Sequence, residues 1–179
     1  MKATGIVRRI DDLGRVVIPK EIRRTMRIRE GDPLEIYTAS DGEVIFKKYS
    51  PIGEVFDIAK QYAEVLNRST NLAVMIFDRD HVIACAGLPK KEVLDRRTTP
   101  ELEDIMEERS NFILDSTSER LFPAEGIEKE ASIAFPIISG GDVSGAVVLI
   151  CDEEKSYPSQ TEIKLAQVAA SFLGKQMEN

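Results

Sequence analysis

Basic side chains are concentrated at the start of this sequence, in a pattern suited to binding a polyanion. The first 29 residues carry nine Lys and Arg against three Asp and Glu, whereas the rest of the chain carries fifteen basic and twenty-eight acidic residues. Seven of the nine are arginines, whose planar guanidinium groups bind phosphates and guanine edges. The net charge of −7 alone is unfavourable for nucleic acid. Its uneven distribution predicts a basic module that meets DNA, with a solvated basic face as the alternative.

Residues that could perform catalysis or hold a metal do not cluster along the chain. The single histidine, His81, lies at an expected hairpin turn and reads as a surface side chain, and Cys85 and Cys151 lie far apart, outside any C-x-x-C pattern. No P-loop, dinucleotide-binding glycine motif or nucleophile elbow is present. The carboxylates between Glu101 and Glu108 have the spacing of a solvated helix face. We therefore predict no enzyme activity, no metal site and no cofactor.

Hydropathy and cysteine usage predict a cytoplasmic protein with no membrane partner. No apolar run approaches the roughly 20 residues that a membrane span needs. The N-terminus is polar and charged, unlike a secretory leader. Two lone cysteines are typical of a protein in a reducing cytosol.

The elements that must position the arginines are short. The pattern indicates strands at 5–10 and 15–18 around a turn at 11–14, a helix between Pro19 and the turn at 31–33, and a hairpin with strands at 34–38 and 43–48. Fifty residues in such short elements bury too little apolar surface to be stable alone. Because no disulfide or metal is available to reinforce them, we expect this segment to dimerise.

The remainder of the chain is predicted to form one α+β domain. Two long helices, over 52–66 and from Ser159 onward, flank an antiparallel sheet whose strands are expected at 72–77, 81–86, 131–138 and 143–151. A short helix follows Pro100, and residues 115–129 are polar and irregular. Ser159 and Glu162 have the spacing of a capping box, which marks the start of the last helix.

Both long helices carry apolar residues at alternating steps of three and four. They are Ile52, Val55, Ala59, Tyr62 and Leu66 in the first helix, and Ile163, Ala166, Ala170, Leu173 and Met177 in the second. This heptad spacing fits a helix that covers its own sheet, and equally a bundle of helices between chains. The second arrangement predicts that homodimers associate weakly into a homotetramer through these helices.

Residues 5–32 resemble the AbrB family of bacterial transition-state regulators, which bind DNA. The resemblance rests on residues 5–9, 12–24 and 26–32, and its most specific part is Gly14-Arg-Val-Val-Ile-Pro19. It implies an all-β swapped-hairpin barrel over residues 1–50, in which two chains interlace their strands. It also implies that the partner is double-stranded DNA, contacted by five arginines: Arg8, Arg9, Arg15, Arg23 and Arg24.

Residues 55–179 resemble a GAF domain, a sensory α+β fold with an antiparallel sheet and flanking helices. The resemblance is carried by residues 132–140 and 143–149, before the closing helix. The signature of cyclic-nucleotide GAF domains is absent. The domain is therefore either a sensor for an unidentified small-molecule effector or a closed scaffold that only oligomerises. Polar candidates for an effector site are Arg79, Arg96, Arg97, Asp115 and Ser132. Residues 51–54 would be a short rigid connection.

The two parts together resemble a family of sporulation transcription factors of spore-forming bacilli, over essentially the whole chain. This resemblance implies a regulator that acts in the forespore, activating some genes and repressing others. Two alternatives stay open. An antitoxin of a toxin–antitoxin pair would share the N-terminal fold, although the disordered toxin-wrapping tail of such proteins is not evident here. A nucleoid architectural protein would use the GAF domain as an unliganded scaffold.

Overall fold

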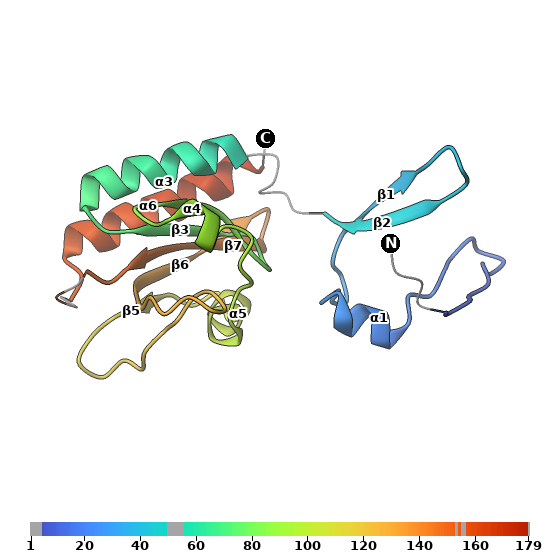
Figure 1. Cartoon of the computed structure of the whole chain (residues 1–179), viewed down its shortest axis with the longest axis horizontal. Helices are drawn as coiled ribbons and strands as arrows, with labels where there is room; N and C mark the ends of the chain where they lie inside the picture. The colour runs from blue at the N-terminus through green and yellow to red at the C-terminus, as the bar shows by residue number, and fades with distance from the viewer. Residues whose placement is uncertain (1–4, 50–55, 153, 155–156, 179) are drawn as a thin grey trace. The chain divides into compact units, whose positions relative to one another are not determined.

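Two units make up the chain, and they divide between Tyr49 and Ser50. The computed structural model describes residues 5–49, 56–152, 154 and 157–178 (Figure 1). The short rigid connection expected at residues 51–54 lies outside the described residues.

The N-terminal unit contains a helix and a hairpin among its described residues. Helix α1 spans Lys20–Thr25, and strands β1 (Leu34–Thr38) and β2 (Val44–Lys48) pair antiparallel. Both the helix after Pro19 and the hairpin are therefore confirmed. The helix ends earlier than the turn at residues 31–33, because Arg27 adopts a φ of 50°, outside the right-handed helical region.

Residues 5–19 form no strand in the single chain, so the strands predicted at 5–10 and 15–18 are wrong as elements of one chain. The turn between them is confirmed, since the Gly14 N–H donates to the Asp11 carbonyl at 3.0 Å. The physical reason lies in the pairing: the sheet of this unit contains β1 and β2 alone among the described residues. Without a neighbouring strand, the apolar side chains of this segment stay exposed, and Val7 is 85% exposed.

The C-terminal unit is built on a five-stranded antiparallel sheet in the order β4-β3-β7-β6-β5. The strands are β3 (Val74–Phe77), β4 (Val82–Ala86), β5 (Phe112–Ile113), β6 (Ala131–Ser139) and β7 (Asp142–Ile150). The helices are α3 (Phe56–Thr70), α4 (Lys90–Val93), α5 (Pro100–Glu107) and α6 (Gln160–Gln176). Helix α4 and strand β5 were not predicted.

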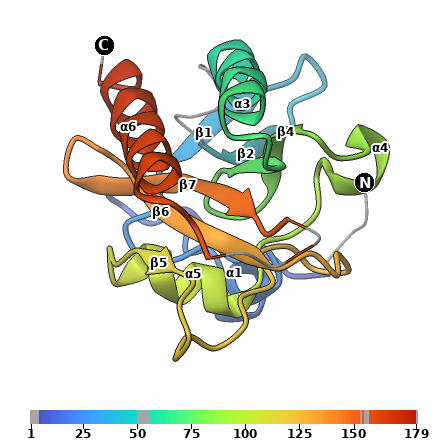
Figure 2. The same cartoon turned by 90° about the vertical axis from the view of Figure 1, so that its left-hand side faces the viewer.

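Two apolar layers enclose this sheet. Helices α3 and α6 lie side by side over one face, and α5 lies on the other, as Figures 1 and 2 show. Successive side chains of a strand point to opposite faces of the sheet, so residues of β3 alternate between the two layers. Val74 and Ile76 pack under α3 and α6, whereas Met75 and Phe77 pack toward α5. The short helix expected after Pro100 is confirmed as α5 and contributes buried Leu102 to the second layer, and residues 115–129, predicted to be polar, contribute buried Leu121.

The heptad stripes of α3 and α6 belong to the chain's own core. Ala59, Leu66, Ala166, Ala170 and Leu173 are buried against the sheet. The prediction that these residues join chains is therefore wrong, because a helix that covers a sheet uses the same three–four spacing as a bundle. Ile52 and Val55 lie outside the described residues.

The start of α6 is confirmed as predicted. The Glu162 N–H donates to Ser159 Oγ at 3.3 Å, and the Ser159 N–H donates to Glu162 Oε2 at 2.6 Å. This reciprocal pair satisfies two N–H groups that a helix otherwise leaves without an internal acceptor.

Candidate nucleic-acid interface

The five arginines predicted to contact DNA are all exposed and lie in two groups of the N-terminal unit. Arg8, Arg9 and Arg15 flank the turn at 11–14, while Arg23 and Arg24 occupy the last turn of α1. Four of them, all except Arg15, make no side-chain hydrogen bond or ion pair with a described residue. Such side chains keep all their N–H donors available for an anion.

Arg15 differs because Asp11 holds it. Asp11 Oδ1 accepts the N–H groups of Leu13 at 3.0 Å and Arg15 at 2.7 Å, and Asp11 Oδ2 accepts Arg15 Nε at 2.8 Å. The Asp11 N–H in turn donates to the Arg15 carbonyl at 3.0 Å. These bonds, first that from the Arg15 backbone N–H and then that from its guanidinium, lower the pKa of Asp11.

Sequence reasoning missed Asp11, although a signal was present. An Asp at the first position of a turn that ends in Gly is typical of a side chain that accepts N–H groups further along the turn. Gly14 at the end of this turn has a φ of 77°, which L side chains rarely adopt.

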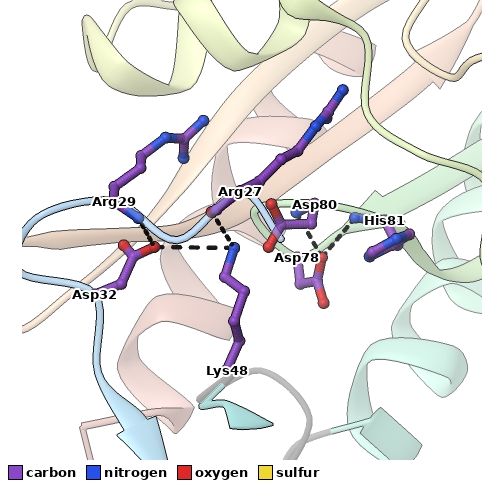
Figure 3. A network of polar contacts seen from close by, with 7 residues as sticks. All are labelled: Arg27, Arg29, Asp32, Lys48, Asp78, Asp80 and His81. Carbon is purple, nitrogen blue, oxygen red and sulfur yellow. Dashed lines mark hydrogen bonds and ion pairs between the residues drawn. The ribbon is translucent and has the colours of Figure 1, made fainter. Parts of the chain in front are cut away.

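Lys48 ties the hairpin to the segment that follows α1, as Figure 3 shows. Its Nζ donates to the Arg27 carbonyl at 3.0 Å and lies 3.9 Å from Asp32 Oδ2. The Asp32 side chain is only 4% exposed and also accepts the Arg29 N–H at 2.8 Å. This cluster fixes where α1, which carries Arg23 and Arg24, lies relative to β2.

The N-terminal unit has almost no core of its own. Among residues 5–49, only Pro19 is buried. Large apolar side chains are exposed throughout the unit: Ile6, Val7, Ile10, Leu13, Val16, Val17, Met26, Ile36, Tyr37, Val44, Phe46 and Tyr49. An apolar surface of this extent normally marks a site of association.

The polar candidates of the C-terminal unit make local contacts. Buried Ser132 donates from Oγ to the Leu149 carbonyl at 3.2 Å, between β6 and β7. Asp115 Oδ1 accepts the N–H of Thr117 at 2.7 Å and so closes a loop turn. Arg96 Nε donates to the Glu92 carbonyl at 2.8 Å. Arg97 is exposed and Arg79 half-buried.

A similar local bond closes the turn between β3 and β4. Asp78 Oδ1 accepts the N–H groups of Asp80 at 2.7 Å and His81 at 2.6 Å (Figure 3). Over the described residues, no three His, Cys, Asp or Glu side chains group in a way that could hold a metal ion. No helix within the described ranges is long and apolar enough to cross a membrane.

Two family models match the chain, one for each unit. Residues 54–178 match the family described as stage V sporulation protein T C-terminal, transcription factor. Residues 7–54 match the family described as antidote-toxin recognition MazE, bacterial antitoxin.

Curated relatives and solved structures agree with this division. The stage V sporulation protein T of Bacillus subtilis is 51% identical over 180 residues, which is 99% of each chain. The transition state regulatory protein AbrB of the same organism is 57% identical over 63 residues, covering 32% of this chain and 65% of that protein. The GAF domain of an Acinetobacter phosphoenolpyruvate-protein phosphotransferase superposes with a TM-score of 0.54 at 12% identity, covering 73% of this chain and 84% of that one.

Together these findings define a DNA-binding transcription regulator with an AbrB-like N-terminal domain followed by a GAF domain. The fold class expected from the sequence is confirmed at this level. The chain belongs to the stage V sporulation protein T family.

Proposed function

We propose that this chain regulates forespore gene expression during sporulation, activating some promoters and repressing others as a dimer that grips double-stranded DNA. The proposal comes from its similarity to the stage V sporulation protein T of Bacillus subtilis. The observation that carries DNA binding is the group of five exposed arginines on the N-terminal unit, and it is supported by the 57% identity to AbrB over 63 residues.

Dimerisation follows from the missing core. A unit in which Pro19 alone is buried among residues 5–49 cannot offset the conformational entropy lost on folding. In the proposed swapped-hairpin barrel, segments 5–10 and 15–18 pair with strands of a second copy. That pairing would cover Val7, Ile10, Val16 and Val17 and satisfy the backbone of both segments.

The DNA interface is tested by replacing Arg23 with alanine in the full-length chain. We expect Arg23→Ala to weaken binding to duplex DNA several-fold or more, because a phosphate contact is lost in each chain. The matched control is Lys91→Ala, which removes the same charge from an exposed position of α4. Equal affinities for the two variants, both folded, would overturn the assignment of Arg23 to the interface.

Regulation is distinguished from DNA packaging by a genome-wide binding map in sporulating cells. Discrete peaks at promoters whose transcripts change on deletion of the gene would support the proposal. Uniform coverage of the chromosome would instead favour the architectural alternative. The antitoxin alternative is weakened because residues 56–152 and 157–178 include a folded domain with its own core, where a toxin-wrapping tail would be disordered.

We further propose that the GAF domain joins two dimers into a tetramer, through apolar residues of α3 and α6 other than the buried members of the heptad stripes. Val65 on α3 and Val168 on α6 are 56% and 54% exposed, and Phe56 and Phe172 are exposed on the same helices. Tyr62 stacks on Phe172 with ring centroids 5.2 Å apart, so this apolar surface is continuous across the two helices. A pair of such helices from each of two chains would form a four-helix contact.

Sedimentation equilibrium of a double variant tests the tetramer. Val65→Asp with Val168→Asp should yield dimers, because each charge would be buried in the contact. The control places aspartates at Ser69 and Thr161, exposed polar positions of the same helices. Tetramers that persist in the folded valine variant would contradict this interface. The effector alternative is tested separately, by a screen for metabolites that raise the melting temperature of the protein.

A further inference from the structure

We propose that Asp11 is a positioning residue that orients Arg15 to read a base edge in DNA. This inference rests on the proposed DNA interface and adds to it a division of labour among the arginines. Arg15 would supply sequence selectivity, whereas Arg8, Arg23 and Arg24 would supply affinity through phosphates, which carry no sequence information directly.

The carboxylate of Asp11 is itself fixed before it holds Arg15. Its Oδ1 accepts two backbone N–H groups of the same turn, those of Leu13 and Arg15. The turn is closed on the backbone as well, by bonds from Gly14 to Asp11 and from Asp11 to Arg15. Oδ2 is thereby presented at a defined point, where it accepts Arg15 Nε at 2.8 Å.

This contact leaves the useful end of the guanidinium open. Arg15 uses Nε for Asp11, and its side chain is 69% exposed. The two terminal nitrogens of an arginine carry four further N–H donors in one plane. A guanidinium held in this way presents the fork that matches the O6 and N7 acceptors of guanine in the major groove.

Neither stability nor general affinity explains the pair. An exposed ion pair of this kind adds little to folding. A carboxylate beside DNA phosphates also lowers affinity for every sequence by repulsion. The Asp11 carboxylate therefore favours discrimination between sequences over general affinity. On DNA that offers Arg15 no pair of acceptors, the repulsion between this carboxylate and the phosphates is not offset by a bidentate contact from Arg15.

The experiment compares Asp11→Asn with Asp12→Asn in the full-length protein. Asn keeps an oxygen that accepts the turn N–H groups, so the turn is retained while the ionic hold on Arg15 is lost. Asp12 is the matched control, since it is exposed, adjacent and makes no side-chain hydrogen bond or ion pair with a described residue. The probes are the duplex that the wild-type protein enriches from a random-sequence library and a shuffled duplex of the same composition.

The readout is the ratio of the dissociation constants for the two duplexes at one salt concentration. We expect the ratio to fall at least about threefold in Asp11→Asn and to stay within about twofold in Asp12→Asn. Arg15→Lys, which keeps the charge but removes the fork, should lower it roughly 5- to 100-fold, as expected for a lost bidentate base contact. Both Asn variants should bind the shuffled duplex slightly more tightly.

Three results would overturn the inference: equal ratios in the two Asn variants, an Arg15→Lys variant with an unchanged ratio, or a wild-type protein without sequence preference. If Asp11→Asn fails to fold, Arg15→Lys decides alone. Failure here remains distinguishable from failure of the proposed function, because Arg23→Ala tests the interface without involving Asp11.

Discussion

The backbone of Gly174 in α6 lies directly against the carbonyl group of Ile138 in β6. A Cβ at position 174 would lie 3.1 Å from the carbonyl carbon of Ile138 and closer still to its oxygen. Neither backbone can move away without opening the layer that contains Leu173, which is fully buried.

Gly174→Ala should therefore destabilise the GAF domain. In an open helix the change would be stabilising by about 1 kcal/mol, but here the overlap should reverse the sign and cost roughly 1–3 kcal/mol. Urea denaturation followed by circular dichroism measures the difference. Ser171→Ala, on an exposed position of the same helix, should stay within about 0.5 kcal/mol of the wild type. A Gly174→Ala variant of equal or greater stability would contradict the packing described.

Lys48→Met should destabilise the N-terminal domain, because it removes the donor to the Arg27 carbonyl and a cation that lies 3.9 Å from the Asp32 carboxylate, whose side chain is only 4% exposed. We expect a loss of roughly 1–3 kcal/mol, the cost of leaving such groups incompletely paired. Lys47→Met removes the same charge from the neighbouring position, where Lys47 lies over the Tyr37 ring. A larger loss in Lys47→Met than in Lys48→Met would show that the cluster around Asp32 is not what fixes α1.

The salt dependence of DNA binding should report the number of phosphate contacts, because the slope of log K against log salt is proportional to that number. If Arg8, Arg15, Arg23 and Arg24 of both chains all contact phosphates, the slope of log K against log salt is about −7. If Arg15 reads a base edge instead, the slope is about −5, because two contacts leave the count. Fluorescence anisotropy over a range of salt concentrations measures it. A slope near zero would rule out an electrostatic interface of either kind.

Glu178 should contribute to the acid sensitivity of the GAF domain. Its carboxylate accepts Lys175 Nζ at 2.7 Å and the Gly140 N–H at 3.1 Å, and these contacts, that of Lys175 first, lower its pKa from 4.5. A carboxyl whose pKa is depressed by folding stabilises above its unfolded pKa, and this stabilisation is lost as the pH falls through the folded value.

Glu178→Gln should consequently flatten the decline of melting temperature below about pH 4.5, with a small effect because the group is exposed. Glu128→Gln is the control, an exposed glutamate with no side-chain hydrogen bond or ion pair to a described residue. If the melting temperatures of the two variants decline identically as the pH falls below about 4.5, the contact between Glu178 and the turn at Gly140 contributes nothing to folding.

Local signals in the sequence predicted the elements that are stable within one chain. The capping box at Ser159 and Glu162 and the hairpin of β6 and β7 depend on neighbouring residues, and both are present. Helix α4 and strand β5 have four and two residues, too few to produce a periodic pattern. Residues 5–10 and 15–18 have strand composition, but composition does not say which chain supplies the pairing strand.

The sequence also predicted only part of the candidate DNA-binding site. Charge and resemblance predicted the arginines by residue, from Arg8 to Arg24. The sequence indicates that Asp11 begins the turn at 11–14, but the bond from Arg15 Nε to Asp11 Oδ2 depends on the conformation of that turn, which spacing does not specify. The heptad spacing of α3 and α6 correctly predicted which residues make apolar contacts. The spacing does not indicate whether those contacts are with the sheet of the same chain or with another chain.

The near absence of buried residues between positions 5 and 49 has a consequence for control by dosage. When a domain obtains its core from a second copy, its folded fraction follows mass action and rises with the concentration of the chain. Dilution below the dissociation constant of the dimer would then abolish the DNA-binding surface itself, and not only its second half-site. The amount of protein made would set a threshold for occupancy of promoters, sharper than the response of a monomer that folds alone.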